Sequence, residues 1–135
     1  MFQKMKEIYI SMYGKEKVNK QDLLKIEEVL EVHLPTDFIK ISEFYSGGIV
    51  GGIEHLSISL DCDENILTKT LYIRNHINLP NKYLVLSEMN ESLILLDTEN
   101  SHVIWIDSVD MSFERADYWN SYAEFFSYMI EEEEN

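Results

Sequence analysis

Residues 83–106 read YLVLSEMNESLILLDTENSHVIWI, and this stretch holds three apolar runs separated by short polar segments. The runs are Tyr83–Leu86, Leu93–Leu96 and Val103–Ile106. The polar segments between them are too short for a helical crossover, so we expect hairpins and an antiparallel meander. Each run is apolar at consecutive positions, which predicts central strands that are covered on both faces.

Three helices are predicted before this meander. The first covers 2–13, where apolar residues recur at helical spacing. The second covers 20–32 with Asn19 as its N-cap. The third starts at Leu34-Pro35, because proline suits a first helical turn, and stops at Gly47-Gly48.

The section between the third helix and the meander has a different period. Leu56, Ile58 and Leu60 alternate with polar residues, including His55, which predicts a half-buried strand. Asp63 is expected to cap a short helix over 64–75.

A last helix is predicted after the meander. Ser121 and Glu124 have the spacing of a capping box, in which each side chain accepts from a backbone N–H near the other. The Glu131–Glu134 run lies at the negative end of this helix, so we expect it to fray into an acidic tail over 131–135.

These elements together predict an α+β fold. Its central antiparallel sheet has about five strands in a meander, backed by the N-terminal helices and the C-terminal helix. The chain has 135 residues and no linker or repeat, so we expect a single domain over 1–135.

The charge of the chain excludes several classes of partner. Eleven Lys and Arg stand against 25 Asp and Glu, for a formal net charge of −14. Nucleic-acid binding is disfavoured because it needs clustered basic residues, and an anionic membrane is disfavoured by the same sign. A basic protein partner is favoured, since opposite fields steer encounter.

The excess of acids is confined to part of the chain. Residues 1–40 contain seven Lys and seven acids, whereas residues 41–135 contain four basic residues and 18 acids. This asymmetry predicts an acidic face. Cys62 is the single cysteine, and Met1–Tyr13 lacks the apolar core of a signal peptide, so the expected location is the cytoplasm.

No catalytic or metal-binding pattern is present in the sequence. The four histidines are dispersed, and the acidic stretch around Cys62 lacks the spacing of an EF-hand loop. No glycines of a nucleophile elbow surround Cys62. We therefore predict no catalytic residue, no metal and no cofactor.

Candidate partner-binding residues follow from acids that lie beside aromatic side chains, because aromatic residues anchor protein interfaces. The leading segment is 107–119, and the alternative is that it forms a solvated loop without a binding role. Trp105 is expected to be structural, whereas Trp119 fits a core or an exposed position equally well. The candidates are Asp107, Asp110, Glu114, Asp117, Tyr118 and Trp119, together with Asp61, Asp63 and Glu64.

Several motifs, in order, resemble the SUKH superfamily, which includes yeast cell-wall assembly regulator-like domains. The motifs span about residues 20–130, and Ser46 stands where the family commonly has asparagine. They are Leu24-Lys-Ile-Glu-Glu-Val-Leu30, Leu34-Pro-Thr-Asp-Phe38, Phe44-Tyr-Ser-Gly-Gly48, Leu79-Pro80, Tyr83-Leu-Val85, Leu95-Leu-Asp97, Val103-Ile-Trp-Ile-Asp107 and Ser121-Tyr-Ala-Glu-Phe-Phe126.

The resemblance implies a non-enzymatic immunity protein, an antitoxin that binds and neutralises a cognate bacterial toxin domain. The expected toxin is a basic nuclease, of the LXG type if the composition reflects an AT-rich bacterial genome. The implied mechanism is occlusion of the toxin's active site or substrate channel.

Two other classes stay open. One is a regulatory or scaffolding module that binds an endogenous protein, as in cell-wall assembly. The other is an enzyme or small-ligand binder, which a pocket with convergent polar groups would favour. The oligomeric state is not indicated by the sequence.

Overall fold

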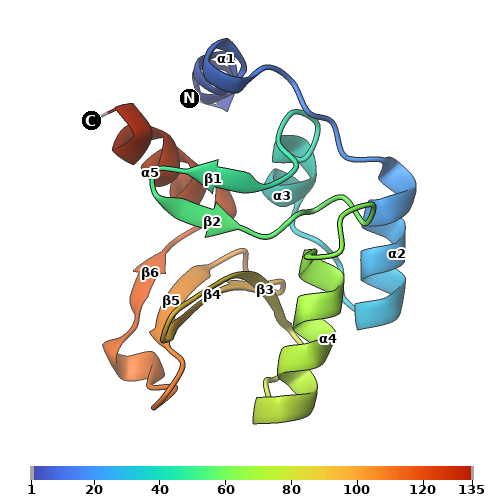
Figure 1. Ribbon diagram of the computed structural model, residues 1–135, viewed down its shortest axis with the longest axis vertical. Coiled ribbons are helices and arrows are strands. Elements are labelled where there is room, and N and C mark those ends of the chain that lie inside the picture. The colour runs from blue at the N-terminus through green and yellow to red at the C-terminus, as the bar shows by residue number, and fades with distance from the viewer. Residues whose placement is uncertain (1, 135) are drawn as a thin grey trace.

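The computed structural model describes residues 2–134 and has an α+β fold (Figure 1). A four-stranded sheet has the order β3-β4-β5-β6 and is antiparallel throughout. A separate two-stranded hairpin, β1–β2, lies between this sheet and the helices α1 and α5 (Figure 1).

The helices are α1 (Phe2–Tyr13), α2 (Lys20–Leu30), α3 (Thr36–Ile41), α4 (Ile66–Ile77) and α5 (Tyr122–Glu134), with a 3-10 turn at Phe113–Arg115. The strands are β1 (Gly48–Val50), β2 (Ile53–His55), β3 (Tyr83–Met89), β4 (Ser92–Asp97), β5 (Val103–Asp107) and β6 (Asp117–Trp119).

The meander is confirmed, with strands β3, β4 and β5 at the three apolar runs. Alternate side chains of these strands belong to two different apolar clusters, one on each face of the sheet. Ile94 and Leu96 of β4 pack into the larger cluster with the helices, whereas Leu93 and Leu95 pack with Ile73 of α4. Burial on both faces explains why these strands are apolar at consecutive positions.

An aromatic cluster joins the N- and C-terminal helices. The ring of Phe126 on α5 lies 5.7 Å from Tyr9 of α1 and 4.9 Å from Tyr45, measured between ring centroids. Phe44 lies 5.7 Å from Phe126 on the same cluster. Tilted aromatic pairs of this kind add about 0.5–1.5 kcal/mol each beyond the burial of their area. The cluster therefore fixes α1 against α5.

The β1–β2 hairpin is attached to the edge of β3. A bulge interrupts the pairing of β3 with β4 between Val85 and Ser87. At this bulge the carbonyl of Leu86 accepts from Leu56 N–H at 2.8 Å, and Ser87 Oγ donates to the Glu54 carbonyl at 2.7 Å. The bulge thus frees β3 groups that hold the hairpin in place.

The predicted strand at Leu56–Leu60 is wrong. The extended residues lie just before it, in β1 and β2, and the 56–60 segment is irregular. Ile58 is fully buried, and its backbone N–H donates to the Ser46 carbonyl. The backbone N–H of Leu60 donates to Asp22 Oδ2. Of residues 56–60 only Ile58 is buried, whereas Leu56 and Leu60 are half-buried like the serines beside them, so the alternation in sequence does not correspond to a strand with one buried face.

Several helix boundaries differ from the sequence prediction. Helix α4 starts later than expected, because Asn65 and not Asp63 is the N-cap, with its Oδ1 accepting from Thr68 N–H at 2.9 Å. Helix α3 ends at Ile41, well before Gly47, and Pro35 is its N-cap. The Asn19 N-cap of α2 is confirmed by a 2.8 Å bond from Gln21 N–H.

The C-terminal glutamates are exposed but helical up to Glu134, so the predicted fraying over residues 131–134 is wrong; residue 135 lies outside the described residues. Glu133 Oε1 accepts from Gly51 N–H of the hairpin at 2.9 Å. This bond lowers the pKa of the Glu133 carboxyl, and a hydrogen bond from Tyr13 lowers it further. The hairpin tip and α1 thus hold the last turn of α5.

Candidate functional site

The acids of the 107–119 segment are partly engaged in the turn that follows β5. Asp107 Oδ1 accepts from Val109 N–H at 2.7 Å. Asp110 Oδ1 accepts from Ser112 N–H at 3.1 Å, and its other oxygen pairs with Arg115 at 2.5 Å. Asp107 and Asp110 therefore shape the loop, although both remain exposed.

The aromatic residues of this segment differ in their surroundings. Trp119 is half-buried and packs against Trp105, Phe125 and Tyr128, with ring centroids 6.4, 5.0 and 5.2 Å away. Tyr118 is 51% exposed and donates to the Phe113 carbonyl at 2.7 Å. Trp119 is thus mainly a packing residue, and Tyr118 is the aromatic side chain presented to solvent.

Glu114 lies within the 3-10 turn and Asp117 begins β6, and both residues are exposed. Neither carboxylate forms an ion pair within residues 2–134. With Tyr118, these two residues form the free part of the 107–119 segment.

The second group of candidates, Asp61, Asp63 and Glu64, lies in the exposed loop before α4. In Figure 1 this loop is well separated from the β5–β6 connection, which lies at the opposite corner of the molecule. The nine candidate residues therefore occupy two surfaces. Glu64 instead shares a hollow with Glu16 and Glu54, which sequence reasoning did not single out.

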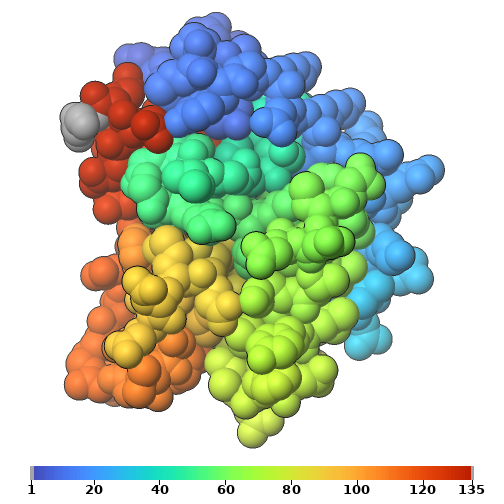
Figure 2. All heavy atoms as spheres, in the orientation of Figure 1, coloured from blue at the N-terminus to red at the C-terminus, as the bar shows by residue number. Residues whose placement is uncertain are grey.

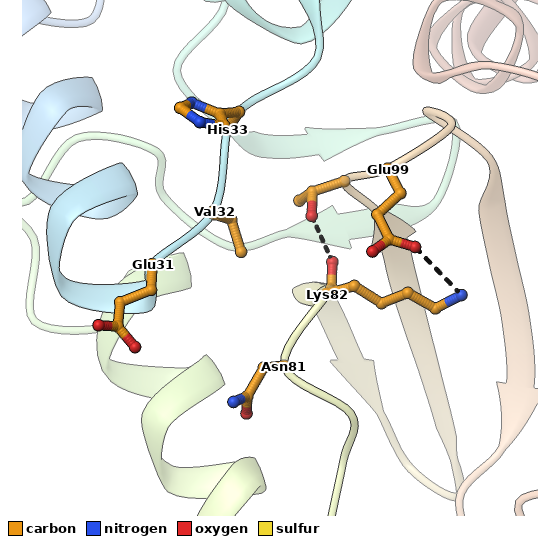
Figure 3. A pocket seen from close by; sticks show the side chains of 7 residues that line it. Glu31, Val32, His33, Asn81, Lys82 and Glu99 are labelled. Atoms are coloured by element: carbon orange, nitrogen blue, oxygen red, sulfur yellow. Dashed lines mark hydrogen bonds and ion pairs between the residues drawn. The ribbon is translucent and has the colours of Figure 1, made fainter.

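A hollow of about 500 Å³ lies between the end of α2 and the start of β3 (Figure 3). Lys82 crosses it, with Nζ 3.2 Å from Asp97 and 3.8 Å from Glu99. The Asp97 hydrogen bond raises the pKa of Lys82. His33 and Glu31 do not converge with Lys82 on one point (Figure 3). The polar groups are already paired or splayed apart, so this hollow offers no catalytic constellation.

A buried polar pair joins β2 to α5. His55 is 2% exposed, contrary to the sequence expectation that it faces solvent. Its Nδ1 lies 2.7 Å from the Leu56 carbonyl and its Nε2 lies 2.9 Å from the Tyr122 hydroxyl. A carbonyl only accepts, so Nδ1 carries the proton and Nε2 accepts from Tyr122. Burial lowers the pKa of the imidazole to about 4, which keeps His55 neutral.

The contacts of Asp37 explain why the Leu34–Phe38 motif contains an aspartate. Its Oδ2 accepts from Ala123 N–H in the first turn of α5 at 2.9 Å. Its Oδ1 accepts from Ser101 Oγ at 2.8 Å and from the backbone N–H of Phe38, which lies in the same helix as Asp37. Asp37 therefore caps α5, accepts one N–H in the first turn of its own helix α3, and secures the β4–β5 turn. The capping box of α5 is also present, since Ser121 Oγ accepts from Glu124 N–H and Glu124 accepts from Asn120 N–H.

No three His, Cys, Asp or Glu side chains among residues 2–134 gather closely enough to hold a metal ion. None of the described helices has the length and apolar character needed to span a bilayer.

The family comparison matches nearly the whole chain. The family described as SUKH_5, SMI1-KNR4 cell-wall, matches residues 1–131. No curated protein matches the chain. The match includes the helices, the meander and the capped α5 described above. The match over residues 1–131 therefore assigns this protein to the SUKH (SMI1-KNR4) family, known for the immunity proteins of polymorphic toxin systems.

Proposed function

We propose that this protein is an immunity protein that binds and neutralises a cognate bacterial toxin domain and performs no chemistry of its own. The observation that supports this proposal is the family match over residues 1–131. The hollow at Lys82 is consistent with it, since its polar groups are paired to one another instead of aimed at a substrate.

The charge supports a basic toxin as the partner. A nuclease needs a positive surface to hold its substrate, and a protein with net charge −14 is attracted to such a surface. By occupying the active site or substrate channel, the immunity protein keeps the nucleic acid out. Nuclease–immunity pairs of the colicin type reach dissociation constants down to about 10⁻¹³ M or lower.

The proposed contact residues lie on the two surfaces described above. Three exposed residues are suited to contact a partner, namely Glu114, Asp117 and Tyr118. Neither carboxylate forms an ion pair within residues 2–134. Asp107, Asp110 and Trp119 hold the surrounding loop in shape. Asp61, Asp63 and Glu64 form the second candidate surface.

A regulatory module that binds an endogenous protein is the second candidate function. The family description includes cell-wall proteins, which favours such a role for some members. The two functions differ in one respect, because only the immunity protein has a toxin encoded beside it.

Co-expression tests the proposed function. The toxin domain encoded next to this gene is expressed from an inducible promoter with and without this protein. We expect growth to be rescued and the two proteins to purify together. Continued killing, with this protein present in soluble form, would contradict the proposal.

A further inference from the structure

A concave surface of about 390 Å³ lies beside the β1–β2 hairpin, and we call it the hairpin hollow. It is lined by Ile49 and Glu54 of the hairpin, by Leu56, by Glu16 and by the loop residues Cys62 and Glu64. Figure 2 shows the hairpin in green and the loop in lime green meeting on one open face of the molecule. Segments far apart in sequence therefore build this surface.

Three carboxylates around the hollow come from three different segments. Glu16, Glu54 and Glu64 are all exposed, and none of them forms an ion pair within residues 2–134. Glu16 accepts one hydrogen bond, from Ser46 Oγ at 3.0 Å. No Lys or Arg occurs between Lys40 and Lys69, the stretch that contains Glu54 and Glu64, whereas Glu16 lies between Lys15 and Lys17.

An aliphatic side chain accompanies these acids. Ile49 is 64% exposed on the outer strand of the hairpin, between the exposed Gly48 and the buried Val50. Leu56 adds a half-buried apolar surface to the same hollow. A long cationic side chain combines these two requirements, because its methylene stem packs on apolar atoms while its charged end reaches carboxylates.

We propose that the hairpin hollow receives a lysine or arginine side chain that protrudes from the cognate toxin. This inference rests on the proposed function and names the contact by which it operates. The stem of the basic residue packs against Ile49 and Leu56, and its charged end lies among Glu54, Glu64 and Glu16. The toxin's basic residue, once bound in the hollow, can no longer bind the phosphates of the toxin's substrate.

The hollow is a stronger candidate for such a contact than Asp107 and Asp110 of the 107–119 loop. In that loop Asp110 already pairs with Arg115, and Asp107 already accepts from backbone N–H groups. Glu54 and Glu64 in the hollow form no ion pair within residues 2–134, so a cation from the partner replaces solvent there and not an internal ion pair. Loss of one member of a charge pair within an interface raises the dissociation rate most strongly.

The test compares two variants that remove the same formal charge. Glu54→Gln/Glu64→Gln removes two charges from the hollow, and Glu28→Gln/Glu91→Gln removes two from exposed positions on α2 and in the β3–β4 turn, outside the hollow and both candidate surfaces. Binding to the toxin domain encoded next to this gene is measured by surface plasmon resonance, and the folded state of each variant by thermal denaturation. We expect the hollow variant to bind the toxin at least about tenfold more weakly than the wild type, and the control variant to bind within about twofold of it. Both variants should have the melting temperature of the wild type.

Ile49→Ala provides a second variant that leaves the charge unchanged. Ile49 is exposed, so its truncation leaves the core intact, and we expect weaker binding mainly through faster dissociation. Equal affinity of the hollow variant and the wild type, or equal losses in both double variants, would overturn the hollow as the contact while leaving the immunity function standing. Failure of the wild-type protein itself to bind the toxin would overturn both.

Discussion

Asp37 holds three segments of the chain with one carboxylate. It accepts from Ala123 N–H at the start of α5, from Ser101 Oγ in the β4–β5 turn and from Phe38 N–H in its own helix. A helix start has free N–H groups that need acceptors and favours a negative charge. Asp37 meets this need for α5 from a position 86 residues away in sequence.

Replacement of Asp37 by alanine should therefore destabilise the fold. Asp37→Ala leaves Ala123 N–H and Ser101 Oγ without this acceptor, at a cost of about 1–3 kcal/mol in the free energy of unfolding. Urea denaturation measures this cost. Asp61→Ala is the matched control, because that side chain is exposed, and it should change the stability by less than about 0.5 kcal/mol. Equal stability of the two variants would contradict the capping role.

His55 should make the stability of the protein depend on pH below neutrality. The unfolded chain protonates this imidazole near pH 6.5, whereas the folded protein protonates it only near pH 4. Between these values the unfolded state binds more protons, so the free energy of unfolding falls as the pH is lowered from 6.5 to 4. The full loss is about 3 kcal/mol, and above pH 6.5 the residue adds no pH dependence.

The measurement compares urea denaturation of the wild type and His55→Gln at pH 7 and at pH 4.5. The glutamine variant cannot titrate, so its stability should fall less over this range. Nitrogen chemical shifts of the wild-type imidazole provide a second readout that needs no variant, and they should report a neutral ring with the proton on Nδ1 at pH 5. A charged His55 ring at that pH would contradict the account.

At the scale of elements, the β1–β2 hairpin depends on a glycine at its tip. Gly51 has φ +60°, and a Cβ placed there would lie 2.4 Å from the Met129 carbonyl oxygen of α5. Gly52 has a similar φ of +77°, but a Cβ there would meet open space. The hairpin can approach α5 this closely because residue 51 has no side chain.

The two glycines form a matched pair for mutation. Gly52→Ala should cost about 1 kcal/mol from backbone strain alone. Gly51→Ala should cost about 1–3 kcal/mol more, because the added methyl group collides with the α5 backbone. Thermal denaturation ranks the two variants, and a Gly51→Ala protein as stable as Gly52→Ala would show that the approach to α5 is not tight.

The elements that sequence patterns predicted correctly are those with strong local signals. The meander has three apolar runs of strand length, and the starts of α2 and α5 have capping residues that act within a few positions. The β1–β2 hairpin was missed because its strands are three residues long and its support comes from the β3 bulge. Strand β6 was missed for the same reason of length.

The candidate site could be predicted in composition but not in arrangement. The acid content predicts a basic partner, since net charge follows directly from the sequence. The convergence of Glu16, Glu54 and Glu64 depends on tertiary contacts between segments without any local pattern. The buried pair of His55 and Tyr122 is equally non-local, and the alternating pattern assigned His55 to the wrong face.

At the scale of the whole molecule, the four basic residues after position 40 are all engaged internally. Lys69, Lys82 and Arg115 pair with acids, and Arg74 donates to the Leu30 and Asn81 carbonyls. The surplus of acids in 41–135 is therefore left to face solvent or a partner. Such a surplus produces a long-range field that salt weakens.

The association rate with the toxin should accordingly depend on ionic strength. Stopped-flow association in about 0.02 M and about 0.5 M NaCl should differ by at least about tenfold, because long-range attraction is screened at the higher concentration. The dissociation rate should change much less. An association rate that does not change with salt would contradict electrostatic steering by this surface.

The central claim is that this protein holds its toxin inactive by binding it. The most direct measurement is a titration of the purified toxin domain, encoded next to this gene, with the purified protein while the hydrolysis of nucleic acid is followed. We expect activity to fall linearly and to reach zero at one equivalent of this protein. A toxin that remains fully active in the presence of excess protein would contradict it.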